Sequence, residues 1–132
     1  MKRAAEILTD RQTVRAALEA YRRIEEDIQN KLQFAKEAEE EAEKYASEAE
    51  ELRTVKREII RCLNGLPSAE RNALYYHYIQ GRTWAWVSVK CAYSERQIRN
   101  IANRGLDRLS RTFAEVPVMA SFCSRIQGRP TL

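Results

Sequence analysis

Apolar residues recur at helical spacing along most of the chain, and breaks in that pattern divide it into three segments. Residues 1–64 contain neither Gly nor Pro and are rich in Ala, Glu, Lys, Arg and Gln, a composition that favours helix. Thr9 and Gln12 have the spacing of a capping box. A continuous helix over residues 12–62 would be about 75 Å long, and an isolated helix of that length needs a partner.

Within this first segment, mostly apolar residues repeat every seven positions, as they do in a coiled coil. The repeat includes Val14, Tyr21, Ile28, Leu52 and Ile59. It weakens in the alanine-rich stretch 35–49 and is interrupted by Lys31. We therefore expect a homodimer or higher homo-oligomer formed through a long N-terminal helix. The alternative is a helix pair within one chain, turning near Asn30 or within residues 37–51.

The second segment, residues 65–113, opens at the clearest break in the chain. Gly65 can cap the preceding helix, and Pro67 suits the start of the next one. Residues 68–79 are predicted to form a helix that ends before Gly81. Three of its side chains are expected in a small core: Leu74, Tyr76 and Tyr78.

Two short amphipathic patterns follow, separated by a tight junction. In the first, helical spacing predicts one buried face, formed by Trp84, Val87, Ser88 and Cys91. Thr83 stands where an N-cap hydroxyl is expected. Ala92 and Tyr93 make the junction, with Tyr93 able to fill its inner side. Ser94 then opens the second helix, and Gln97 completes a capping box.

The second helix has two chemically different sides. Its inner side consists of Ile98, Ile101, Ala102, Gly105, Leu106 and Leu109. Its outer side carries Glu95, Arg96, Arg99, Asn100 and Asn103. These are the residue types that read base edges, since Arg bonds guanine, Asn bonds adenine and Glu accepts from cytosine. A charged helix face is often only solvated, but a capped first helix at this distance favours a helix-turn-helix that binds DNA.

The residues from Leu66 to about Leu109 resemble region 4 of bacterial sigma-70 factors, and more closely the small phage and prophage transcriptional regulators of the late-gene activator type. The resemblance rests on LPSAERNALYYHYIQG, TWAWVSVKC and YSERQIRNIANRGLDRL, about a third of the chain. It implies that the outer face of the second helix reads bases. It also implies phosphate contacts from Arg82, Thr83, Ser94, Gln97 and Arg104. The housekeeping pattern has Arg then Glu where Glu95 and Arg96 stand, so that family's DNA site is not carried over.

Charge is distributed unevenly between the two halves of the chain. Residues 1–64 hold 13 basic and 15 acidic side chains, whereas residues 65–132 hold 10 basic and 4 acidic ones. Positive charge is thus concentrated where the DNA-binding pattern lies, as phosphate neutralisation requires. The acidic half has a different role, for which oligomerisation is the natural candidate.

Trp86 and Val89 fall on the side of their helix that faces away from its buried positions. We expect this apolar pair to pack against the long N-terminal helix. If it is exposed, it is a candidate contact for RNA polymerase or a partner subunit.

The sequence contains no pattern that indicates a catalytic, metal or cofactor site. Cys62, Cys91 and Cys123 are isolated, and the single histidine, His77, is expected to be a partly exposed surface residue. No glycine-rich loop could hold a nucleotide. Unpaired thiols suit a reducing cytoplasm, and neither a signal peptide nor a membrane span is recognisable.

We therefore expect an all-helical protein with a long, coiled-coil-like helix over residues 1–64, a helix-turn-helix domain over 65–113 and a tail over 114–132. The tail is expected to hold a short docked piece around 118–126. The expected function is sequence-specific transcriptional regulation on double-stranded DNA, with residues 94–109 as recognition helix. The alternatives are a phage assembly or DNA-packaging oligomer, similar to small terminase subunits, and a polymerase-binding co-regulator with weak DNA contact.

Overall fold

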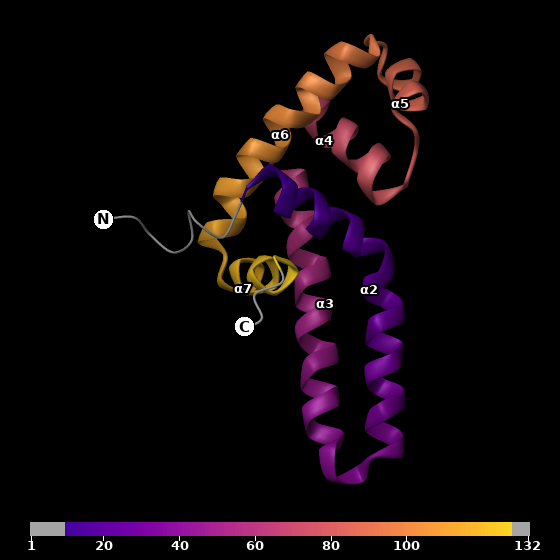
Figure 1. The fold of residues 1–132 in the computed structure, drawn as a ribbon, viewed down its shortest axis with the longest axis vertical. Helices are drawn as coiled ribbons and strands as arrows, with labels where there is room; N and C mark the ends of the chain where they lie inside the picture. The colour runs from indigo at the N-terminus through magenta and orange to yellow at the C-terminus, as the bar shows by residue number, and fades with distance from the viewer. Residues whose placement is uncertain (1–9, 128–132) are drawn as a thin grey trace, which may run out of the picture.

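The structure, a computed structural model, describes residues 10–127, and over this range the chain is helical with short connections. The elements are α2 (Arg11–Glu37), the 3₁₀ turn η1 (Glu39–Glu41), α3 (Ala42–Asn64), α4 (Ser68–Leu74), the π-helical turn η2 (Tyr75–Ile79), α5 (Trp84–Cys91), α6 (Glu95–Glu115) and α7 (Pro117–Ile126). Figure 1 shows α2 and α3 as a long antiparallel hairpin, with α4, α5 and the first half of α6 at one end of it. The prediction of an all-helical fold is confirmed.

The first 64 residues do not form one long helix: the chain reverses at Ala38, within the stretch where a turn was the alternative. Around the turn, Glu37 and Glu41, and likewise Glu39 and Glu43, would be neighbours on one helix face, where like charges destabilise the helix. Reversal also lets the apolar repeat bury itself within one chain. Six of its positions are at most 1 % exposed: Val14, Ala17, Ile24 and Ile28 in α2, and Ala49 and Ile59 in α3. Tyr21 and Leu52, two other members of the repeat, are partly buried.

Polar contacts fix the alignment of α2 with α3. Lys31 lies 2.7 Å from Glu48, and Lys56 lies 3.1 Å from Glu25. These ion pairs are largely solvated, so each contributes little to stability. Instead, the pairs define the register of the two helices, because shifting one helix by a turn would separate both pairs.

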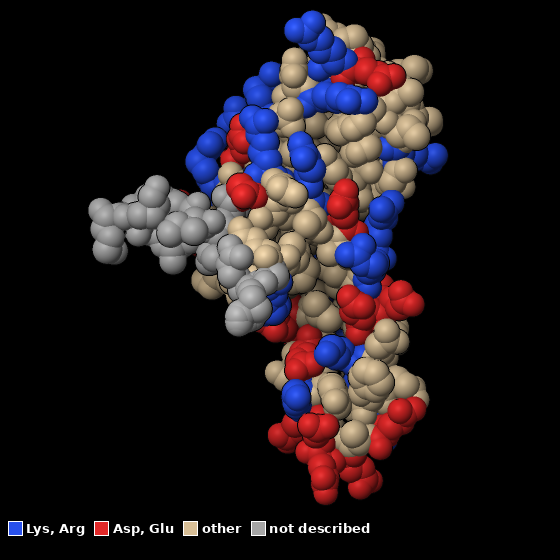
Figure 2. Space-filling model, viewed as in Figure 1, with Lys and Arg blue, Asp and Glu red and all other residues tan. Residues whose placement is uncertain are grey.

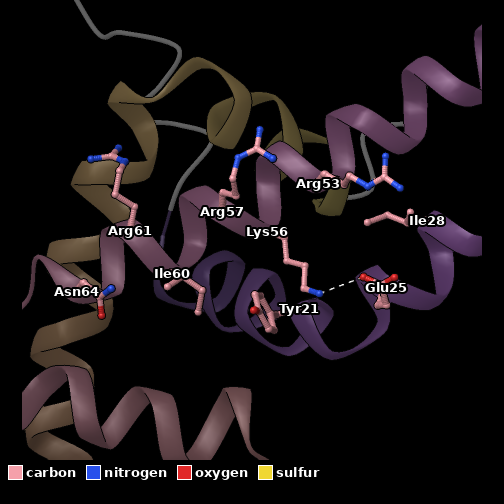
Figure 3. A pocket seen from close by; sticks show the side chains of 9 residues that line it. All are labelled: Tyr21, Glu25, Ile28, Arg53, Lys56, Arg57, Ile60, Arg61 and Asn64. Carbon is pink, nitrogen blue, oxygen red and sulfur yellow. Dashed lines mark hydrogen bonds and ion pairs between the residues drawn. The ribbon is translucent and has the colours of Figure 1, made fainter.

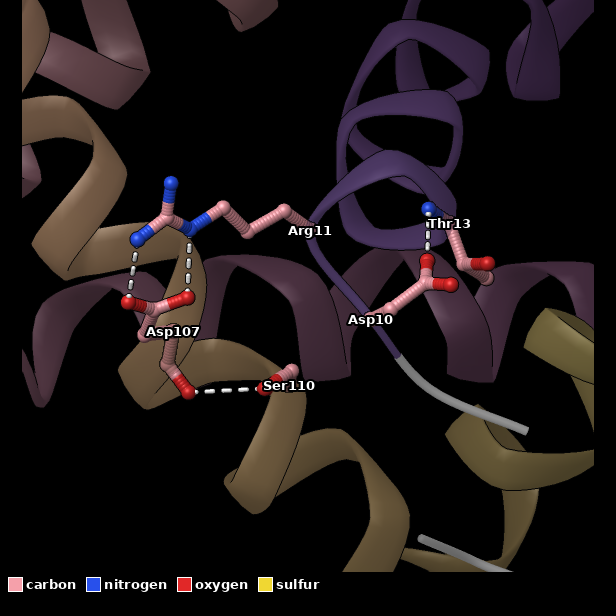
Figure 4. Close-up of polar contacts among 5 residues, drawn as sticks. All are labelled: Asp10, Arg11, Thr13, Asp107 and Ser110. Atoms are coloured by element: carbon pink, nitrogen blue, oxygen red, sulfur yellow. Dashed lines mark hydrogen bonds and ion pairs between the residues drawn. The ribbon is translucent and has the colours of Figure 1, made fainter. Parts of the chain in front are cut away.

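The beginning of α2 is fastened to the middle of α6 (Figure 4). Arg11 donates two hydrogen bonds to Asp107, from Nε to Oδ1 at 2.6 Å and from Nη2 to Oδ2 at 2.8 Å. This guanidinium holds the pKa of Asp107 below its usual value. Asp10 caps α2 by accepting a hydrogen bond from the Thr13 amide at 2.8 Å, whereas the predicted capping residue Thr9 lies outside the described residues.

The predicted tail contains a helix that completes the core. Pro117 stands in the first turn of α7, where its missing N–H costs nothing. Met119 and Cys123 are fully buried, and Phe122 is 8 % exposed. The helix packs against α2, α3 and α6, so the expected docked piece around residues 118–126 is confirmed. In the described part of the chain, no helix is long and apolar enough to cross a membrane.

The hairpin and an intermolecular coiled coil predict opposite effects on stability when Ala49 is enlarged. Ala49 is fully buried between helices, so Ala49→Leu should overpack the core and lower the free energy of unfolding by about 1–3 kcal/mol. In an intermolecular coiled coil, the same change would strengthen a weak seam. Urea unfolding of Ala49→Leu beside Ser47→Leu, at an exposed position of the same helix, distinguishes the two; a stabilised Ala49→Leu variant would contradict the hairpin.

Candidate nucleic-acid interface

Helices α5 and α6 are joined by a tight, left-handed junction. Ala92 has φ 63° and ψ 42°, and its amide donates back to the end of α5, while the Tyr93 amide donates to the Ser88 carbonyl at 3.0 Å. A non-glycine residue in this conformation is disfavoured, so the packing of both helices must hold it there. Tyr93 was expected to fill the inner side of the turn, but its side chain is 40 % exposed, so that expectation is wrong.

Both helices begin at the predicted caps. Thr83 Oγ1 accepts a hydrogen bond from the Trp86 amide at 3.1 Å. Ser94 Oγ accepts from the Gln97 amide at 3.1 Å, and the Ser94 amide donates to Gln97 Oε1 at 3.0 Å, which completes the capping box. In each case the cap uses an acceptor oxygen, so the hydroxyl and amide protons of these side chains can still be donated to a phosphate.

The inner faces pack as the spacing predicts. Val87 and Ser88 of α5 are buried, and Trp84 and Cys91 are partly buried. The six predicted inner positions of α6 are all buried: Ile98, Ile101, Ala102, Gly105, Leu106 and Leu109. Gly105 marks the point where α4 crosses α6 most closely. A Cβ atom there would lie 2.9 Å from Leu74 Cδ1 and 3.2 Å from Glu70 Cβ.

The predicted base-reading residues are divided between two environments. Glu95, Arg96 and Asn100 are exposed on α6. Arg99 is also exposed, but it pairs with Glu95 at 3.5 Å and its guanidinium lies 5.9 Å from the centre of the Trp84 ring. Asn103 is only partly exposed, and with Arg99 it lines a hollow of about 410 Å³.

Two further residues that line this hollow could not be recognised from sequence patterns. Arg15 and Glu19 of α2 line it opposite Arg99 and Asn103. Farther along α2, the guanidinium of Arg22 covers Gly81, since a Cβ on this glycine would lie 2.1 Å from Arg22 Nη1. Helical spacing in α2 indicated a coiled-coil seam but could not indicate which other helix its polar side faces.

Arg82 and Trp86 form a second exposed group at the start of α5. The guanidinium of Arg82 lies 4.5 Å from the centre of the Trp86 ring, a cation–π arrangement. Trp86 packs edge-on against Tyr76, with ring centres 5.4 Å apart, and remains 37 % exposed. The expected packing of Trp86 on the N-terminal helix is therefore wrong. Val89 is 82 % exposed.

His77 links the loop before α5 to the core. Its ring stacks on Trp84 at 3.8 Å and 18°, and Nδ1 lies 2.7 Å from the carbonyl oxygen of Arg82. Because a carbonyl only accepts, Nδ1 carries the proton and donates it. Partial burial lowers the pKa of His77 below its usual 6.5. The sequence indicated the partial exposure of His77 but not this structural role.

The buried Glu70 places a carboxylate behind α6. Its side chain lies 3.0 Å from Arg108 Nε through Oε1 and 4.0 Å from Arg104 Nε through Oε2. Oε1 has this ion pair but no well-directed hydrogen bond. The carboxylate thus holds two arginines of α6 on the side that borders α4, while both remain more than half exposed. Arg104 can therefore still contact an outside anion.

Figure 2 shows the resulting charge distribution on one face of the molecule. Lys and Arg follow the outer side of α6, while Asp and Glu gather at the tip of the α2–α3 hairpin. The described residues contain no group of three or more His, Cys, Asp or Glu arranged to hold a metal ion. Cys62 and Cys123 are buried, and burial raises the pKa of Cys123 to about 11, which makes it a poor nucleophile at neutral pH.

Comparison with protein-family models, with curated proteins and with solved structures finds no match for this chain. The sigma-like resemblance therefore stays a prediction that rests on the residues themselves.

The close crossing at Gly105 can be tested by filling it. Gly105→Leu should lower the free energy of unfolding by at least about 1–3 kcal/mol, because its side chain has no room between α6 and Leu74. Gly105→Ala should cost less, since better helix propensity offsets part of the clash. Thermal and urea unfolding measure both effects. A stabilised Gly105→Leu variant would show that α4 and α6 do not cross there.

The depressed pKa of His77 makes stability depend on pH in a definite direction. The unfolded chain takes up a proton near pH 6.5 and the folded chain takes it up only at lower pH, so stability falls as the pH drops below about 6.5. The loss should level off once the pH passes the folded pKa. In His77→Asn an amide can replace the Nδ1–H donor but cannot titrate. The free energies of unfolding of the wild type and of His77→Asn, measured from pH 7.5 to 5, should become more similar as the pH falls. If the difference between them stays constant over this range, His77 does not have a lowered pKa in the folded protein.

Proposed function

We propose that this protein is a sequence-specific, DNA-binding transcriptional regulator of the kind that phages and prophages encode, in which α5 and α6 form a sigma-region-4-like helix-turn-helix. The observation that carries the proposal is the capped α5–α6 junction, which places the polar, exposed side of the first half of α6 at the end of the molecule opposite the hairpin tip, next to α5 (Figure 1). In this arrangement α6 enters the major groove and α5 braces it.

The side chains suit distinct roles in such a complex. Arg96 and Asn100 read base edges from the exposed stripe of α6, with Glu95 next to them. Arg99 and Asn103 would read from the edge that borders α2, where Arg99 must first leave Glu95. Phosphate contacts come from Arg104 and from the capping side chains, which retain donors.

The remaining phosphate contact is Arg82, which stands beside the N-terminus of α5. Arg15 and Arg22 add positive charge along the neighbouring side of α2. A homodimer or higher oligomer formed through the α2–α3 hairpin would present paired recognition helices. Its DNA site would then consist of half-sites about 10 base pairs apart, or a multiple of that spacing.

A second function is favoured by one observation, the exposed apolar pair of Trp86 and Val89 on α5. This surface suits a contact with RNA polymerase or another protein, which would make the chain a co-regulator with weaker DNA contact. A DNA-packaging oligomer is the other alternative, and the mass of the assembly distinguishes it, because packaging subunits of this kind form rings.

The first experiment is selection from a random double-stranded DNA library near physiological salt, where non-specific binding is weak. We expect a recovered motif, whose half-site arrangement reports the geometry of the bound oligomer. No enrichment from folded protein that binds DNA only at low salt would favour the co-regulator or the packaging oligomer.

Substitutions then separate base contacts from phosphate contacts. Asn100→Ala and Arg99→Ala should each cost about 1–3 kcal/mol of binding free energy on the selected site and relax the preference at one base. Arg104→Ala should weaken binding to all sequences similarly and reduce the salt dependence by about one counterion. Affinities measured by fluorescence anisotropy on selected and random duplexes give both quantities. Equal losses on both duplexes for all three variants would overturn the base-reading assignment.

A further inference from the structure

A groove of about 650 Å³ lies between α2 and the C-terminal half of α3 (Figure 3). Apolar side chains line it from both helices: Tyr21 and Ile28 from α2, and Ile60 from α3. The groove belongs to the hairpin alone, since none of its lining residues comes from α5 or α6. It is therefore separate from the DNA interface proposed above.

Four cations of α3 surround this apolar surface: Arg53, Lys56, Arg57 and Arg61. Figure 3 shows the three arginines projecting from α3, while Lys56 reaches across to Glu25, 3.1 Å away. Glu25 is the one acidic residue among those that line the groove. Two of the arginines also have partners within α3, Arg53 with Glu50 at 3.3 Å and Arg61 with Glu58 at 2.6 Å, and a second copy's carboxylates would replace these solvated pairs. The groove thus combines an apolar interior with a cationic rim, which suits an acidic, partly apolar helix better than a sugar–phosphate backbone.

Helix α3 itself carries exposed acidic side chains in its N-terminal half. Glu43 and Glu50 are exposed and lie seven residues apart, so they share one face of α3, and Arg57 follows at the same spacing. One face of α3 is therefore acidic in its N-terminal half and basic in its C-terminal half. Two copies placed antiparallel would bring each acidic half against the partner's basic half, which is the self-complementarity that a two-fold dimer requires.

We propose that this face of α3 is a dimerisation surface on which a second copy packs antiparallel, with the two-fold axis crossing the exposed side of the helix between Glu50 and Arg53. In this register Glu43 lies opposite the partner's Arg61, and Glu50 lies opposite the partner's Arg53. Ala46, exposed and small, lies opposite the partner's Arg57 and leaves room for its side chain. This surface differs from the apolar repeat predicted to join two chains, because most of that repeat is buried inside the hairpin and only Tyr21 and Ile28 of it line the groove.

The dimer would leave the outer side of α6 uncovered, because its contacts come from α3 and the adjoining edge of α2. It does not depend on DNA binding, so the two proposals can fail separately. Sedimentation equilibrium of the full chain at several protein concentrations measures the mass of the assembly and so tests for the dimer.

The decisive experiment reverses charge in two complementary variants. Arg53→Glu, Arg57→Glu and Arg61→Glu together make the face acidic throughout, and Glu43→Arg with Glu50→Arg makes it basic throughout. Each variant alone should dimerise at least about tenfold more weakly than the wild type, because like charges then face each other. An equimolar mixture should recover dimers, as heterodimers with opposite charges in contact. Circular dichroism checks that each variant keeps its helix content.

Arg23→Glu with Lys36→Glu is the matched control, because both residues are exposed on α2 and neither lines the groove. It should leave the dimer unchanged, whereas raising the salt concentration from about 0.1 to 1 M should weaken the wild-type dimer. A wild-type monomer at low salt and high protein concentration would overturn the proposal. So would a dimer that charge reversal does not weaken, or a mixture of the two variants that stays monomeric while both remain folded.

Discussion

The apolar stripe of α6 is the interaction on which the rest of the structure depends, because it belongs to two groups of helices at once. Near its N-terminus, Ile98 and Ile101 are buried, and α6 packs against both α4 and α5. Near its C-terminus, Leu109 and Phe113 are fully buried where α6 meets the hairpin and α7. A continuous helix transmits position over its whole length, so the proposed recognition surface is oriented by the same helix that anchors the hairpin.

Polar contacts near the middle of α6 refine that arrangement. The bidentate pair of Arg11 with Asp107 ties α2 to the middle of α6, and Glu70 ties α4 to Arg108 on another side of it. Neither pair is strong where its partners are solvated, yet each has a geometry that only one placement of the helices satisfies. Burial of the stripe supplies the stability, and these pairs select the orientation.

The two halves of the molecule differ in charge for reasons that the fold makes clear. The hairpin tip lies far from α6, so the acidic residues gathered there need not repel a polyanion bound to the outer side of α6 (Figures 1 and 2). The proposed dimer would use the same separation along α3, pairing the acidic half of one copy with the basic half of the other. The uneven charge of the chain thus has two proposed roles: positive charge along α6 binds a polyanion, and opposite charges along α3 pair two copies of the chain.

The sequence by itself determined the local features, namely the capping residues Thr83 and Ser94, the inner face of α6 and the all-helical composition, because caps and helical periodicity depend on neighbours within one or two turns. It could not determine that the apolar repeat of residues 1–64 buries itself in a hairpin, since a seven-residue repeat is satisfied equally by a second chain. Nor could it place Trp86 on Tyr76, or Arg15 beside Asn103. Each pair joins side chains of different helices, and only the packing of all helices around α6 decides which of their faces meet.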